Sequence, residues 1–124
     1  MQRDRDQAYL LDIILAAEDI LAFTKGYSEL AFLDDPKTQG AVLHRLILTG
    51  EAVRRLSVAF KDAHPVVPWQ QIAGTRNRVV HEYERVNLKE VWNMVQHDVP
   101  ALIAALRPFL PEVLRKRPAS KRRH

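Results

Sequence analysis

The chain has 124 residues and a formal net charge of +4, with 47% hydrophobic and 27% charged residues. This length fits one domain, and the hydrophobic share is enough for a buried core. The absence of cysteine excludes disulfide bonds and zinc sites built on thiolates. The first residues lack the apolar core of a signal peptide, and the longest apolar stretch, Tyr9 to Ala17, is far shorter than the ~20 residues of a membrane span. We therefore expect a soluble, cytoplasmic protein with no membrane partner.

The positive charge is concentrated at the C-terminus. Residues 114–124 hold six of the 19 lysines and arginines, and all 15 acidic residues lie at or before Glu112. We therefore expect a helical domain over residues 1–112 and a basic, flexible tail over residues 113–124. Such a tail either attracts a polyanion such as RNA, with an affinity that falls as salt rises, or only keeps the chain soluble.

Apolar residues recur every three or four positions between Leu10 and Leu21. This period predicts an amphipathic helix over residues 4–24. Gly26 is expected to end it, because glycine readily adopts the left-handed conformation that follows many helices. One further helical turn is expected around residues 28–32.

A second long helix is predicted over residues 36–62. Asp35 can cap its first turn, and Pro36 suits the first helical position. Its interior contains Gly50, which costs about 1 kcal/mol relative to alanine in a helix. We attribute this glycine to the close approach of another helix.

Two more helices complete the domain. The third is predicted over residues 68–84 and begins at Pro68, and the fourth is predicted over residues 88–110 with Asn87 as its cap. Pro100 lies inside the fourth helix, where it should cause a kink or a break. Four main helices with short links and no strand pattern predict an all-α, up-and-down helical bundle.

The third helix carries the polar pattern of most chemical interest, R-N-R-V-V-H-E-Y from Arg76 to Tyr83. On an ideal helix Tyr83 lies about 20° from Arg76, whereas Asn77 and His81 lie about 100° and 140° from it. One broad face would thus present a phenol, a guanidinium, a carboxamide and an imidazole. Asn77 is four residues before His81, so it can reach that ring or a substrate oxygen.

These side chains suit the cleavage of RNA without a metal. The guanidinium of Arg76 matches a phosphate and can stabilise a pentavalent transition state, and an imidazole such as His81 can deprotonate or orient a ribose 2′-hydroxyl. Because the two residues diverge by about 140° on one helix, they would converge only if two copies of the helix faced each other in a dimer. From the residues alone, the alternative remains open that both are ordinary surface or interface residues.

The segment from Arg76 to Tyr83 resembles the R-x4-H-x-Y motif of HEPN ribonuclease toxins of the HepT type, the toxin half of HEPN/MNT toxin–antitoxin pairs. The resemblance runs over about residues 3–110. It includes the opening of the first helix from Arg5 to Ile13, the segment Phe32 to Val42, Gly50-Glu51-Ala52, Pro65-x-x-Pro68-Trp69, Ile72-Ala73-Gly74 and Val91-Trp92. The basic tail is not part of the pattern.

This resemblance implies a HEPN helical bundle that forms a homodimer with a composite cleft. It implies metal-independent endonucleolytic cleavage of RNA, such as tRNA or mRNA, without a cofactor and with a 2′,3′-cyclic phosphate as product. Arg76 and His81 would be the catalytic pair, and Asn77 would support them. The implied partner is a minimal nucleotidyltransferase (MNT) antitoxin that transfers AMP to Tyr83, adding negative charge beside the arginine. The alternative for Tyr83 is that it is only a half-buried aromatic residue with its hydroxyl in water.

Two other functions remain open on the sequence. One is a non-catalytic helical HEPN module that binds a nucleotide or the nucleotidyltransferase, and the other is a nucleic-acid binder that acts through its tail. We expect no metal site, because the five histidines form no H-x-x-x-H pair. Glu82 and Glu84 diverge by about 200° on a helix and make a poor acid–base pair. Trp69 and Trp92 are interpreted as packing anchors rather than base-stacking residues.

Overall fold

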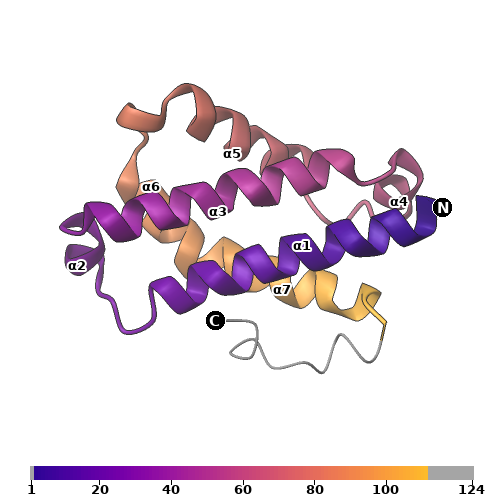
Figure 1. Cartoon of the computed structure of the whole chain (residues 1–124), viewed down its shortest axis with the longest axis horizontal. Helices are drawn as coiled ribbons and strands as arrows, with labels where there is room; N and C mark the ends of the chain where they lie inside the picture. Colours follow the sequence, from indigo (N-terminus) through magenta and orange to yellow (C-terminus); the bar gives the residue numbers. More distant parts are fainter. Residues whose placement is uncertain (1, 112–124) are drawn as a thin grey trace.

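Two long helices, α1 (Gln2–Phe23) and α3 (Pro36–Arg55), lie side by side and run in opposite directions (Figure 1). The computed structural model describes residues 2–111, and every regular element among them is helical. Helix α5 (Trp69–His81) packs on α3, and α7 (Val99–Leu106) packs on α1. The predicted all-α, up-and-down bundle is therefore confirmed. The predicted tail over residues 113–124 lies outside the described residues.

Short helical elements connect and extend the long helices. They are α2 (Glu29–Leu33), α4 (Val58–Ala63), the 3₁₀ turns η1 (Tyr83–Arg85) and η3 (Arg107–Phe109), α6 (Leu88–Asn93) and the π-helical segment η2 (Met94–Asp98).

No helix within residues 2–111 combines the length and apolar character needed to cross a membrane.

The first connection follows the sequence signals closely. Gly26 follows α1 with a φ of +80°, a conformation that glycine adopts without steric cost, so its predicted role is confirmed. Asp35 caps α3 by accepting a hydrogen bond from the backbone N–H of Thr38 at 3.2 Å. The hydroxyl of Tyr27 donates to the same carboxylate at 2.6 Å. This bond, with those from Thr38, lowers the pKa of Asp35 from 3.8 to about 2.

The prediction of one continuous helix over residues 36–62 is wrong. Helix α3 ends at Arg55, the next residue is extended, and α4 begins only after Ser57. The backbone N–H and the hydroxyl of Ser57 donate to the two carboxylate oxygens of Asp6 on α1, at 2.8 and 2.7 Å. Asp6 is 7% exposed, so these bonds give a buried charge the partners it requires. A contact with a distant part of the chain thus lies at the break, where Ser57 also caps α4 by accepting a hydrogen bond from the N–H of Phe60 at 3.0 Å.

The last two predicted helices also differ in detail. Helix α5 ends at His81, three residues before the predicted end. The predicted distortion near Pro100 is present as η2, in which the N–H of Val99 donates to the carbonyl of Met94. Proline has no N–H and its ring clashes with the carbonyl four residues earlier in a regular helix. The wider π-helical turn accommodates Pro100 without ending the helical path.

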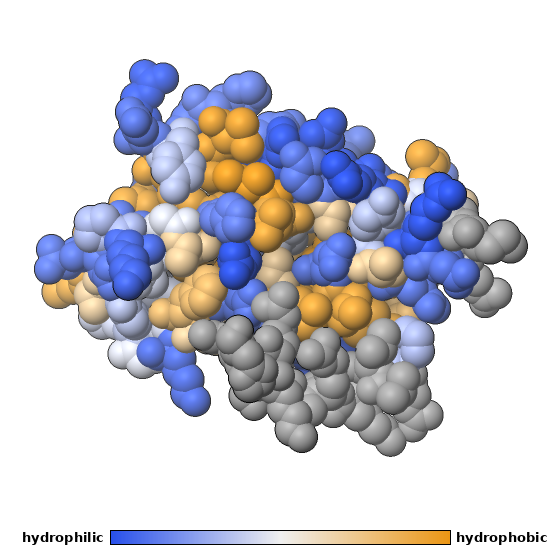
Figure 2. All heavy atoms as spheres, in the orientation of Figure 1, coloured by the Kyte–Doolittle hydropathy of each residue, from blue (hydrophilic) through white to orange (hydrophobic). Residues whose placement is uncertain are grey.

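Two buried clusters fill the space between the helices, and each contains one tryptophan. Trp92 packs on Phe32 with the ring centroids 5.4 Å apart. Trp69 donates its indole N–H to the carbonyl of His64 at 3.0 Å. Both tryptophans are 8% exposed, which confirms that they are packing anchors. Apolar side chains also reach the surface between the polar ones on the face seen in Figure 2.

Candidate active site

The side chain of Arg76 is held between α5 and α3. Its Nη2 forms a hydrogen-bonded ion pair with Glu51 of α3, and its Nη1 donates to Oδ1 of Asn77 at 3.0 Å. Its Nε is buried and has no hydrogen-bond partner among the described residues. The side chain is only 19% exposed. The guanidinium is therefore fixed by two neighbours while part of it still reaches the surface.

Gly50 allows this arrangement. A Cβ atom built on Gly50 would lie 2.1 Å from Cβ of Arg76 and 2.8 Å from its Cγ. No side chain larger than hydrogen fits at that separation, so α3 and α5 can approach this closely only at a glycine. The predicted close approach at Gly50 is confirmed. It also places the guanidinium of Arg76 next to Glu51, the following residue of α3.

Glu51 interacts with other arginines besides Arg76. Nη1 of Arg54 lies 3.8 Å from the other oxygen of Glu51. The hydrogen bond from Arg76 is the main cause that lowers the pKa of Glu51; burial opposes it, and the charges of Arg76, Arg54 and Arg55 add to it. Glu51 thus pairs with Arg76 and lies near Arg54, and the hollow that it lines also contains the carboxylates of Asp12 and Asp19.

His81 is separated from Arg76 within one chain. It is the last residue of α5 and is exposed. Five helical residues place it about 140° around the axis and about 7.5 Å along it from Arg76, whose side chain is turned toward α3. The predicted catalytic pair therefore does not meet in one subunit. Asn77, which was expected to reach His81 or a substrate oxygen, uses its carbonyl oxygen to bind Arg76.

Tyr83 does not lie beside Arg76, contrary to the helical-wheel prediction. Helix α5 has ended before it, and Tyr83 begins the 3₁₀ turn η1. Its hydroxyl lies 3.6 Å from the position that a Cβ on Gly40 would occupy. Gly40 and Gly50 are ten residues apart on α3, which corresponds to about 15 Å. Tyr83 is 46% exposed, and it contacts a different part of α3 from the arginine.

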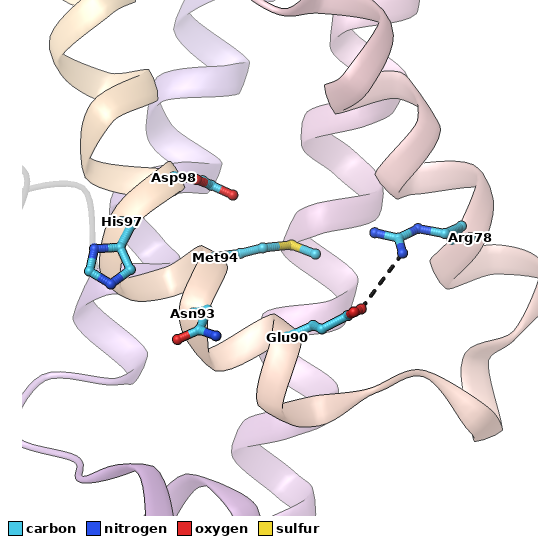
Figure 3. A pocket seen from close by; sticks show the side chains of 6 residues that line it. All are labelled: Arg78, Glu90, Asn93, Met94, His97 and Asp98. Carbon is cyan, nitrogen blue, oxygen red and sulfur yellow. Dashed lines mark ion pairs between the residues drawn. The ribbon is translucent and has the colours of Figure 1, made fainter.

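Two surface hollows flank the motif without including Arg76 or His81. One, of about 530 Å³, lies between α1 and α3 and includes Glu51. The other, of about 490 Å³, lies on the opposite polar side of α5, where Nη1 of Arg78 is 3.7 Å from the carboxylate of Glu90 on α6. Figure 3 shows these two side chains pointing toward each other across its opening. Within residues 2–111, no three His, Asp or Glu side chains are grouped as metal ligands.

These features define an all-α bundle domain whose third long helix carries the arginine and histidine of an R-x4-H-x-Y motif, with the arginine held against the second long helix. The chain belongs to the HepT-like ribonuclease family, since the family model described as "Ribonuclease HepT-like" matches residues 13–109. The likeness therefore covers most of the domain and both ends of the motif.

Named relatives agree with this assignment. The chain is 39% identical over 94 residues to the "Probable ribonuclease HepT" of Thermococcus cleftensis, covering 76% of this chain and 86% of the relative. It is 35% identical over 107 residues to a "Putative RNase" of Methanocaldococcus jannaschii, covering 86% and 88%. It is 34% identical over 102 residues to a "Putative RNase" of Caldanaerobacter subterraneus, covering 82% and 91%. No solved structure gives a significant match.

The sequence analysis missed the role of Glu51. The residue was part of the family resemblance, but no function was assigned to it. The available signal was its position directly after Gly50, where a second helix was expected to approach. A carboxylate at such a crossing is well placed to pair with an arginine on the other helix, but the sequence does not identify which arginine.

Proposed function

We propose that this protein is a metal-independent endoribonuclease whose site combines Arg76 and His81 from two subunits of a homodimer. The observation that carries the proposal is that Arg76 is fixed at the α3–α5 contact while His81 is exposed at the end of the same helix. In this position His81 can act on an RNA phosphate that is bound by Arg76 of the other subunit. The printed names of two relatives, "Probable ribonuclease HepT" and "Putative RNase", support the choice of RNA as substrate.

The chemistry uses only groups of the protein and the RNA. His81 takes the proton of a ribose 2′-hydroxyl, and the 2′-oxygen attacks the adjacent phosphorus. Arg76 stabilises the additional negative charge of the pentavalent transition state. The bond from phosphorus to the 5′-oxygen then breaks, and that oxygen takes a proton from the partner's His81. The products are a 2′,3′-cyclic phosphate and a 5′-hydroxyl.

The surface around the motif supports a dimer. Val80 is 39% exposed and Tyr83 is 46% exposed, so an apolar side chain directly before His81 and an aromatic one shortly after it reach the surface. A second copy of α5 would cover these side chains. It would also bring two Arg76 and two His81 to a shared cleft. Residues that are separated within one chain would then meet across the dimer.

We further propose that the protein is the toxin of a toxin–antitoxin pair and that an MNT antitoxin neutralises it by AMPylation of Tyr83. The partial exposure of Tyr83 supports its role as the acceptor. Its hydroxyl and the stem of Arg76 contact α3 at points about 15 Å apart. We therefore assign the effect of AMP to the charge and bulk that it adds to the shared cleft, rather than to contact with the arginine of its own chain.

The test is cleavage of tRNA and mRNA in EDTA by purified protein whose mass shows Tyr83 to be unmodified, beside His81→Ala and Arg76→Ala. Cleavage by the wild type alone, with cyclic phosphate ends, is the expected result. Equal cleavage by all three proteins would place the activity elsewhere or in a contaminant. No cleavage by the unmodified wild type would favour a non-catalytic module that binds a nucleotide or the nucleotidyltransferase.

A further inference from the structure

We infer that Glu51 is a positioning residue of this site, which holds the guanidinium of Arg76 in the orientation that receives an RNA phosphodiester. The inference rests on the proposed ribonuclease function and deepens it, because it adds a residue from another helix to the machinery. Glu51 contacts neither RNA nor the reacting atoms in this scheme. It acts through Arg76.

The hydrogen bonds of Arg76 show which of its N–H donors remain available to RNA when Glu51 is bound. A guanidinium has five N–H donors. One on Nη2 is bound by Glu51, one on Nη1 is bound by Asn77, and the donor on Nε is buried. Within residues 2–111 no further partner binds the two remaining N–H groups, one on each terminal nitrogen, so we take these as the donors for a phosphate. Without Glu51 the long side chain would rotate, and these donors would lose their fixed direction.

The charges indicate how the loss of Glu51 should affect binding and catalysis. The carboxylate offsets one of the three positive charges of Arg54, Arg55 and Arg76. Removing its charge should leave the affinity for RNA in the ground state unchanged or raise it. The cleavage step requires donors aligned with the charge that develops in the transition state, so the cleavage rate should fall. This opposite response separates positioning from simple attraction of RNA.

A purely stabilising role explains the pair less well. Glu51 is 33% exposed, and partly exposed ion pairs contribute little to folding stability. The contact also depends on Gly50, an unfavourable residue in a helix interior. Helix α3 therefore contains a residue that destabilises it, and this residue allows α3 to contact the stem of Arg76. Such a cost is expected where the orientation of the arginine is needed for function.

The experiment compares wild type with Glu51→Gln, using Glu18→Gln as the matched control. Glu18 also binds an arginine, Arg107, but that pair joins α1 to η3. Single-turnover cleavage is measured on an RNA oligonucleotide, and affinity is measured on the same sequence with 2′-deoxyriboses, which lacks the attacking hydroxyl. We expect Glu51→Gln to cleave about tenfold or more slowly, with affinity equal to or tighter than that of wild type. Glu18→Gln should cleave at the wild-type rate.

A spectroscopic measurement checks the arginine directly. The buried Nε–H of Arg76 should give a proton–nitrogen NMR signal protected from exchange in wild type and Glu18→Gln, and this signal should be lost or broadened in Glu51→Gln. If Glu51→Gln melts well below the control, Glu51→Asp is measured instead. It retains the charge, but it is one methylene shorter and should also slow cleavage.

The outcomes distinguish this inference from the proposed function. If wild type cleaves RNA and folded Glu51→Gln or Glu51→Asp cleaves equally fast, the positioning role is wrong and the ribonuclease proposal stands. Equal losses of rate and affinity would also overturn positioning, because they would indicate a general loss of the site. If unmodified wild type does not cleave RNA at all, the proposed function fails and this inference fails with it.

Discussion

The backbone of Gly50 lies against the side-chain stem of Arg76, so closely that a Cβ atom on Gly50 would be 2.1 Å from Cβ of the arginine. The clash involves the root of the side chain rather than its flexible end. A methyl group at Gly50 must therefore push α5 away from α3 and carry Arg76 away from Glu51.

We expect Gly50→Ala to destabilise the fold and to slow RNA cleavage at least tenfold. Overpacking a tight contact costs about 1–3 kcal/mol, and the better helix propensity of alanine offsets about 1 kcal/mol of this. Urea denaturation and single-turnover cleavage measure the two effects. Gly74→Ala is the control, because a Cβ on Gly74 meets nothing within 4 Å. Gly74→Ala should leave cleavage unchanged and stability equal or higher, and the prediction fails if both variants behave alike.

Replacing Asp6 should loosen the junction between α3 and α4. Asp6→Ala leaves the N–H and the hydroxyl of Ser57 without the acceptors they have at 2.8 and 2.7 Å. Loss of such buried bonds costs about 1–3 kcal/mol, and urea denaturation should show this difference. Asp4→Ala, an exposed position on the same helix, should change stability much less. Equal effects of the two changes would mean that the junction does not depend on this contact.

The carboxylate of Asp35 should titrate at an unusually low pH. Its pKa is lowered to about 2, mainly by the hydroxyl of Tyr27. Tyr27→Phe should therefore raise it toward 3.8, as followed by NMR titration of the carboxyl carbon. Because the pKa is depressed in the folded state, the stability that this group contributes is present above pH 3.8 and is lost as the pH falls toward 2. A titration unchanged by Tyr27→Phe would contradict this assignment.

Tyr83→Phe should keep RNA cleavage but abolish neutralisation by the antitoxin. The change removes only the hydroxyl that we propose as the AMP acceptor, at a side chain 46% exposed, so cleavage should stay near the wild-type rate. Incubation with an MNT protein and ATP should no longer add AMP or inhibit the variant, as mass spectrometry and the cleavage assay would show. Tyr9→Phe is the control and should still be modified and inhibited. Normal modification of Tyr83→Phe would place the acceptor elsewhere.

The sequence predicted the elements that depend on local signals. Asp35, Pro36 and Gly26 mark helix ends through their own backbone and side-chain preferences, and the structure has those ends. The helix break at Ser57 was not predicted. Ser57 caps α4 by accepting a hydrogen bond from the N–H of Phe60, and it also binds Asp6, 51 residues earlier, a contact that the sequence does not reveal. Periodicity continues across the break and gives no sign of it.

The sequence predicted four candidate residues of the site, but not Glu51 and not their geometry. The motif identified Arg76, Asn77, His81 and Tyr83. A helical wheel compares directions around an axis, so it ignored the distance along α5 and assumed that the helix continued to Tyr83. The pairing of Arg76 with Glu51 depends on which face of α5 meets α3, and one chain's periodicity does not specify the partner across a helix crossing.

The π-helical segment Met94–Asp98 also sets the register of everything that follows it. A π turn holds one more residue than the α-helical turn it replaces. If the segment became a regular α-helix with all of its residues kept, the following helix would rotate by about 100° relative to α6. Leu106 and Leu110, which are buried in the same cluster as Leu10 of α1, would then turn away from their partners. Deleting one residue within Met94–Asp98 should therefore preserve the direction in which Leu106 and Leu110 face, whereas deleting one residue within α7 should not.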